Sequence, residues 1–214
     1  PDLGTTLVSV AVAFALLLVA GVRPRILGVL AVAAVLGSAL ILTSGVLKEY
    51  QVARLTTFID QDAAKPKADA EGAAFNLEQG KLAIGAGGMW GQGLFNGAQT
   101  RAGNVPEQRT DFIFTAVGEE LGFVGSATLL ALLGVIVWRV WRAAQLARDE
   151  FGTLLCTGIM VMLVVQIFEN VGMTMGIMPI TGIPLPLMSY GGSALILTFL
   201  SIGLVLSVHM RRFA

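Results

Sequence analysis

The sequence predicts an all-α polytopic membrane protein with about five transmembrane helices and one long extracytoplasmic loop. Its composition is the first observation behind this prediction: 55% of the 214 residues are hydrophobic and 13% are charged, against roughly 25% charged in a soluble domain. The mean hydropathy of +0.78 agrees. In addition, five separate stretches are apolar over enough residues to cross a hydrocarbon core of roughly 30 Å.

The predicted spans follow one another within a single membrane domain, 1–214. They cover residues 3–22, 26–46, 112–137, 151–177 and 194–210. The chain opens on Pro1 without a leader pattern, and we expect a natural N-terminus and further helices to precede it. The zero formal net charge offers no basic field for nucleic acid, and the lone cysteine, Cys156, permits no internal disulfide.

Arginines set the predicted orientation. They follow the first, third and fifth spans, at Arg23, Arg25, Arg139, Arg142, Arg148, Arg211 and Arg212. The 178–192 loop, on the other side, contains no Lys or Arg. Because short cytoplasmic loops are enriched in basic residues, the arginine side is predicted to be cytoplasmic. The C-terminus then lies in the cytoplasm and the long loop, 47–110, lies outside it.

The 47–110 loop is predicted to contain short helices at the membrane interface. Its polar part, 60–72, is typical of a mobile segment. Residues 75–84 repeat apolar side chains at near-helical spacing, which favours a short interfacial helix. Six glycines then crowd into 85–97 around apolar side chains that can dip into the headgroup region. A re-entrant loop that packs on protein is expected there, because lipid cannot pair backbone groups.

Ionisable residues at the third span are the main candidates for chemistry, since charges are costly in a membrane. Asp111 opens this span, where its carboxylate either caps the helix or acts on a headgroup at the bilayer rim; both roles are compatible. Glu119 lies roughly 80° around and about 12 Å along the same helix, so we expect it to line the same cavity lower down. Glu120 points away from Asp111 and is expected to face another helix.

A polar stripe marks the fourth span. Its members recur every three or four residues and are Gln166, Glu169, Asn170, Met173 and Thr174. Interhelical hydrogen bonding is the favoured interpretation of this stripe, ahead of a catalytic role.

Five cations surround the long loop, at Lys48, Arg54, Lys81, Arg101 and Arg109. They are either ordinary solvated charges or a site for an anionic headgroup, for which Arg and Lys are the natural ligands. Arg109, two residues before Asp111, is the best placed. No Cys/His cluster with metal-ligand spacing and no glycine motif for nucleotides occurs in the sequence.

Several motifs in order resemble the SEDS family (shape, elongation, division and sporulation), and its RodA branch more than its FtsW branch. They are PDLGT at 1–5, QGKLAIG at 79–85, GGMWGQG at 87–93, PEQRTDFIF at 106–114, GEELG at 118–122 and GIPLPLMSYGGS at 182–193. The resemblance covers the whole chain, which looks like the C-terminal half of a ten-helix protein.

The resemblance implies a peptidoglycan glycosyltransferase of the bacterial cytoplasmic membrane that polymerises lipid II during cell-wall elongation, with a class B penicillin-binding protein as partner. The family's essential aspartate falls on Asp111 and a further important glutamate on Glu119. Asp111 would act as general base on the acceptor hydroxyl or hold a divalent cation, Mg²⁺ or Mn²⁺. The residues expected to bind substrate are Lys81, Arg101, Arg109, Glu107 and Thr110.

Several positions depart from the family pattern, among them three single residues. Arg109 stands where many relatives have His, Phe75 where Tyr is common, and Gln92 where Lys is usual. The last change removes one candidate phosphate ligand. A lipid II flippase is the rival hypothesis, because Glu119 and Glu169 suit a polar translocation path. A division-type polymerase and a non-catalytic scaffold are further alternatives.

Overall fold

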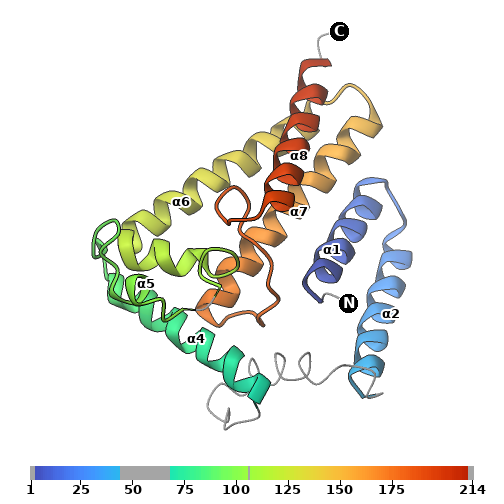
Figure 1. Cartoon of the computed structure of the whole chain (residues 1–214). Coiled ribbons are helices and arrows are strands. Elements are labelled where there is room, and N and C mark those ends of the chain that lie inside the picture. Colours follow the sequence, from blue (N-terminus) through green and yellow to red (C-terminus); the bar gives the residue numbers. More distant parts are fainter. Residues whose placement is uncertain (1–2, 44–67, 106, 212–214) are drawn as a thin grey trace.

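The computed structural model describes residues 3–43, 68–105 and 107–211, and every regular element within these residues is a helix (Figure 1). The helices are α1 (Leu3–Val19), α2 (Pro24–Thr43), α4 (Ala68–Gly87), α5 (Ala98–Ala102), α6 (Ile113–Gln145), α7 (Glu150–Met175) and α8 (Gly192–Arg211). A helix therefore occurs at each of the five predicted spans, which confirms the all-α fold class. Lys48 and Arg54 lie outside the described residues.

Three of these helices, α6, α7 and α8, are long and apolar enough to cross a membrane. The apolar stretches at α1 and α2, Gly4–Val19 and Pro24–Leu40, are shorter, so their assignment as spans stays a prediction. Local signals define α7 well. The Asp149 side chain accepts the Gly152 N–H at 3.2 Å to cap its start, and Gly176 ends it in the left-handed conformation, φ +77°.

The third predicted span, 112–137, is wrong in one respect: it is not one continuous helix. Gly122 inside α6 has φ +65° and ψ −164°, a conformation that glycine alone adopts readily. The short first part of α6 and its long second part therefore run in different directions (Figure 1). The long part of α6 begins after Gly122, and Glu119 belongs to the short helix before the break.

The break at Gly122 leaves backbone groups of α6 without partners inside the helix. The glycine-rich loop after α4 supplies those partners. The N–H groups of Phe123 and Val124 donate to the carbonyls of Gly88 and Met89 at 2.9 and 3.1 Å. In the reverse direction, the N–H groups of residues 92 and 93 donate to the carbonyls of residues 119 and 120, each at 3.0 Å. This agrees with the predicted loop packed on protein. Backbone N–H and C=O groups without hydrogen-bond partners would carry a high free-energy cost in lipid.

Close backbone approach explains the glycines themselves. A β-carbon on Gly91 would collide with the Glu120 carbonyl, and one on Gly87 with the Gly118 carbonyl. The helix predicted at 75–84 is longer than expected, since α4 covers Ala68–Gly87. Of the segment predicted to be mobile, 60–67 lies outside the described residues and 68–72 is the start of α4.

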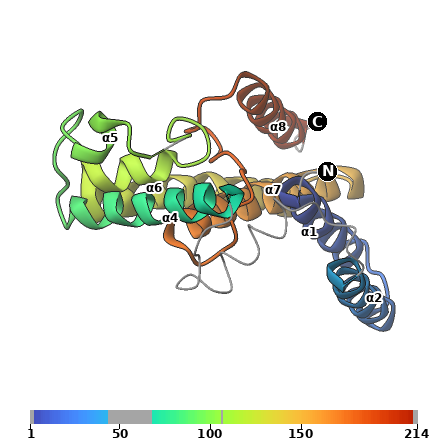
Figure 2. The same cartoon turned by 60° about the horizontal axis from the view of Figure 1, so that its bottom comes forward.

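Three groups of buried side chains occur among the described residues, and two of them join α7 to other helices. One joins α6, α7 and α8 through Val140, Ala144, Cys156, Leu163 and Val205. The other lies where α4 crosses the ends of α6 and α7, and includes Leu77, Ala83, Phe112, Met173 and Ile180. α4 packs on α6 and α7, and α1 packs on α7, while α2 lies away from the rest (Figure 2). The second group includes Phe112, the residue that follows Asp111.

Candidate functional site

Asp111 lies in a tight turn just before α6. The Glu107 carbonyl accepts the N–H groups of Thr110, Asp111 and Phe112 at 3.1, 3.1 and 3.2 Å. The Thr110 hydroxyl also donates to the Glu107 carboxylate, at 3.0 Å. Glu107 has φ +51°, a region that is unusual for a residue with a side chain. These bonds fix the backbone that carries Asp111, whose side chain is half-buried.

The interpretation of Asp111 as a helix cap is wrong. The cap position of α6 is Phe112, and no side chain makes a cap hydrogen bond there. Thr115 instead donates both its N–H and its hydroxyl to the Phe112 carbonyl, at 3.0 and 2.7 Å. The Asp111 carboxylate is therefore not needed to start the helix.

One buried amide joins the Asp111 turn to the loop after α7. Asn170 Nδ2 donates to the Asp111 carbonyl and to the Ile183 carbonyl, both at 2.7 Å, and Asn170 is fully buried. Next to Ile183, Gly182 has φ +77°, and a β-carbon built on it would lie 3.1 Å from Asp111 Oδ2. The Asp111 carboxylate therefore lies directly against the Gly182 backbone.

Lys81 approaches the same loop from α4. A β-carbon on Gly80 would lie 3.2 Å from Thr115 Cγ2, so α4 packs against the start of α6 at this point. A β-carbon on Gly176 would lie 2.7 Å from Lys81 Nζ, so the ammonium rests on the last turn of α7, where a helix carries partial negative charge. Asp111 and Lys81 thus contact two ends of one short segment, 176–182.

The other cations are less closely tied to Asp111. The Arg109 side chain is exposed, while its carbonyl accepts the Tyr190 N–H at 2.8 Å and so joins the turn to the end of the 178–192 loop. Arg101 is exposed in the last turn of α5. Lys81, Arg109 and Arg101 are thus set on three different segments around the turn.

Glu119 is fully buried, and its carboxylate faces α5. Glu119 Oε1 accepts the Gln99 N–H at 2.7 Å, and Oε2 accepts the N–H and the hydroxyl of Thr100 at 2.9 and 2.7 Å. The Thr100 hydroxyl in turn accepts from Gln108 Nε2 at 2.9 Å. Glu119 therefore connects α5 to the chain segment three residues before Asp111. The prediction that Glu119 lines a cavity below Asp111 assumed a helix from Asp111 onwards, whereas α6 begins at Ile113 and the Glu119 carboxylate is bonded to α5.

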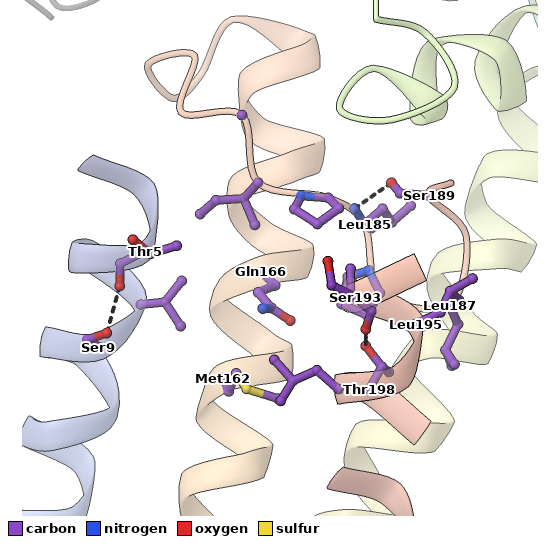
Figure 3. A pocket seen from close by; sticks show the side chains of 17 residues that line it. Thr5, Ser9, Met162, Gln166, Leu185, Leu187, Ser189, Ser193, Leu195 and Thr198 are labelled. Atoms are coloured by element: carbon purple, nitrogen blue, oxygen red, sulfur yellow. Dashed lines mark hydrogen bonds between the residues drawn. The ribbon is translucent and has the colours of Figure 1, made fainter. Parts of the chain in front are cut away.

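The polar stripe of α7 bonds mostly to loops, so the interhelical interpretation is wrong for its central members. Asn170 holds the two carbonyls described above, and Glu169 Oε1 accepts the Thr181 hydroxyl at 3.1 Å. Gln166 points into a cavity of about 360 Å³ between α1, α7, α8 and the 182–189 loop (Figure 3). Thr5, Ser193 and Thr198 line the same cavity, which Gly182 separates from Asp111.

Asn170 and Gly182 are site residues that the sequence placed only in a polar stripe and in the 182–193 motif, without a role beside Asp111. Both had a signal: an amide in a membrane helix is costly unless it is paired, and a glycine before Ile-Pro favours a turn. Neither signal reveals the partner. No group of three His, Cys, Asp or Glu side chains that could hold a metal ion occurs among the described residues.

Comparison with known proteins was made on the whole chain. The family model FTSW_RODA_SPOVE, described as "Cell cycle protein", matches residues 1–213. The chain is 41% identical over 213 residues to the peptidoglycan glycosyltransferase MrdB of Escherichia coli K12, covering 99% of this chain and 56% of that protein. It is 37% identical over 211 residues to the stage V sporulation protein E of Bacillus subtilis, covering 97% of this chain and 54% of that protein.

A solved structure is also similar. Its title is "Structural coordination of polymerization and crosslinking by a peptidoglycan synthase complex", and it matches with a TM-score of 0.77 and 32% sequence identity. The match covers 100% of this chain and 57% of the solved one. The chain thus spans about half the length of the curated relatives that it matches.

Proposed function

The chain belongs to the FtsW, RodA and SpoVE family of cell cycle proteins, and from this premise we propose that it is the part of a peptidoglycan glycosyltransferase that carries the catalytic base. The proposed reaction is the polymerisation of lipid II into glycan strands. The name of the similar Escherichia coli protein, peptidoglycan glycosyltransferase, supports it. The observation that carries it is a half-buried carboxylate whose backbone is fixed at both carbonyl and N–H, with a lysine beside the same loop.

In the proposed step, a sugar hydroxyl of the acceptor attacks the anomeric carbon of the donor. A new C–O bond forms while the bond between that carbon and the diphosphate oxygen breaks. Asp111 accepts the hydroxyl proton, a contribution of roughly 10²–10⁴-fold for a positioned base. The diphosphate leaves with its negative charge, which Lys81, Arg109 and Arg101 would stabilise. Glu107 and Thr110 hold the turn, and Glu119 supports it through α5 without touching the reacting atoms.

We further propose the setting in which this reaction runs. The protein would lie in the bacterial cytoplasmic membrane with 47–110 on the outer side and its C-terminus in the cytoplasm, as the arginine pattern suggests. A class B penicillin-binding protein would be its partner, and elongation its process. The cavity beside Gly182, lined by apolar and hydroxyl side chains, would hold the lipid portion of a substrate. A divalent cation, Mg²⁺ or Mn²⁺, held by Asp111 together with the diphosphate would supply further positive charge to the leaving group.

The test uses the complete protein with its penicillin-binding partner, the transpeptidase of which is blocked. Labelled lipid II is supplied, and the products are separated on a gel with and without EDTA. Asp111→Asn keeps the shape of the side chain and should lower polymerisation by about 10²-fold or more. Asp149→Asn is the matched control, since it changes a carboxylate at the other end of α7 and keeps a capping oxygen.

Each result has a defined meaning. A glycan ladder that is lost with Asp111→Asn and kept with Asp149→Asn supports the proposal. If the ladder is lost in EDTA, polymerisation depends on a metal ion that the protein holds together with the substrate. A folded wild-type complex that makes no polymer would overturn the transferase and favour the flippase. Against the flippase, the two buried glutamates that a translocation path would use accept hydrogen bonds from α5 and from Thr181.

A further inference from the structure

We propose that an aromatic tip on the glycine-rich loop inserts into the lipid headgroup region and anchors this loop to the bilayer. The aromatic tip is defined by Met89, Trp90, Leu94 and Phe95. This inference does not depend on the proposed reaction, because it concerns where a surface lies and not what the site does.

The aromatic tip exposes large apolar side chains together. The exposed fractions are 59% for Met89, 81% for Trp90, 61% for Leu94 and 79% for Phe95. No charged residue occurs in 82–100, so moving this stretch out of water does not require desolvating a charged side chain. Trp and Phe are the residues that amphipathic segments place at the boundary between headgroups and acyl chains.

The aromatic tip is held rigidly in this exposed arrangement. The four backbone hydrogen bonds that join 88–93 to 119–124 prevent the loop from folding back over its own apolar side chains. Phe95 has φ +61°, an unfavourable conformation for a bulky residue. Such a conformation persists where the surrounding structure fixes it. Here the Asn96 N–H donates to the Gly93 carbonyl at 3.1 Å, and this turn presents Phe95 to the outside with 79% of its surface exposed.

The length of α6 gives the depth of the aromatic tip. Beyond the break at Gly122, α6 rises about 1.5 Å per residue, so Trp141 lies roughly 28 Å further along. Trp138, Arg139, Trp141 and Arg142 together form the Trp and Arg belt that is typical of one membrane interface. The hydrocarbon core is roughly 30 Å thick, so Gly122 lies at the opposite interface. The aromatic tip bonds directly to the residues on either side of Gly122 and shares this depth.

Insertion would fix the height of the site above the membrane. Gln92, between the two halves of the tip, accepts the Ala98 N–H at 3.0 Å, and Glu119 accepts the next two N–H groups of α5. A tip anchored in lipid therefore sets the level of α5 and, through Gln108, of the Asp111 turn.

Tryptophan fluorescence in vesicles tests the proposal. The complete protein is prepared with Trp90 as its only tryptophan, every other tryptophan, Trp138 and Trp141 included, being replaced by Phe. It is reconstituted into phosphatidylcholine brominated either near the carbonyl end or near the methyl end of the acyl chains. A matched variant retains Trp138 instead, which is half-exposed on α6 and serves as the lipid-facing reference. Aqueous iodide is added in a separate titration.

We expect a blue-shifted Trp90 emission. Trp90 fluorescence should fall more with bromine near the carbonyl end of the acyl chains than with bromine near the methyl end. Iodide should quench Trp90 no more than it quenches the Trp138 reference. Quenching by iodide without quenching by bromine would put the tip in water and overturn the proposal. Protection from both quenchers would also overturn it, because a protein surface would then cover the tip.

Discussion

Asn170 offers the sharpest test of how the candidate site is assembled. Asn170→Ala removes the single amide that donates to the carbonyls of Asp111 and Ile183, each at 2.7 Å. Two buried carbonyl oxygens then lose their partner. At about 1–3 kcal/mol for each unsatisfied group the cost reaches roughly 2–6 kcal/mol. If both bonds behave like average side-chain bonds in membrane proteins, at about 0.6 kcal/mol each, the cost is near 1 kcal/mol.

The larger effect is expected on the reaction. Without the amide, the Asp111 turn and the Gly182 backbone are free to separate, and a displacement of about 1 Å at a reacting group costs on the order of 10²-fold in rate. The fall should appear in kcat more than in KM for lipid II, because Asn170 does not touch the substrate in the proposed mechanism. The assay is initial polymerisation rate against lipid II concentration in the reconstituted complex.

Thr157→Val is the matched control for Asn170→Ala. Thr157 is also buried on α7, but its hydroxyl donates to Thr153 on its own helix, at 2.8 Å, and joins no other segment. It should keep the wild-type rate. If Asn170→Ala also polymerises lipid II at the wild-type rate, in a complex that melts at the wild-type temperature, the positioning argument is refuted.

Three further substitutions test separate parts of the structure. Gly182→Ala places a β-carbon 3.1 Å from Asp111 Oδ2 at φ +77°, and should reduce polymerisation more than it reduces the melting temperature. Glu119→Gln leaves one acceptor oxygen for three donors, and should destabilise α5 by about 1–3 kcal/mol, seen as faster proteolysis at 97–105. Gly91→Ala should lower the melting temperature strongly because its β-carbon collides with the Glu120 carbonyl, whereas Gly85→Ala, with open space around it, should not. Equal melting temperatures for these two alanine variants would contradict the close backbone packing of the loop.

Much of the architecture was predictable because it depends on local properties. Apolar runs of sufficient length predicted helices at five places, and a helix occurs at each. The glycine-rich loop was predicted to pack on protein, and its backbone pairs with residues 119–124. Asp111 was identified as a candidate by its place before an apolar run, and the structure brings it against Gly182 and near the loop that Lys81 contacts.

The errors share one cause, which is that hydrogen-bond partners come from segments far away in the chain. Gly122 was read as part of a continuous apolar run, so one helix was predicted over 112–137 where a short helix and a long helix form. A glycine can lie within a helix or at a break in one. Which of the two forms depends on whether another backbone segment offers hydrogen-bond partners to the groups that the break leaves unpaired. Here the partners come from 88–93, far earlier in the chain. The polar stripe on α7 was misassigned for the same reason, since its partners are loop carbonyls and a loop hydroxyl.

The sequence by itself determined that this protein belongs in a membrane and where most of its helices lie, and it identified Asp111 as the candidate base. Helix formation and transfer into lipid are sums over neighbouring residues, so they can be evaluated along the chain. Only the tertiary structure decided that Asn170 joins Asp111, 59 residues away, to Ile183, and that Glu119 serves α5. Such pairings depend on which segments pack together. A buried donor bonds to an acceptor that is close in space, and separation along the sequence does not tell which acceptor that is.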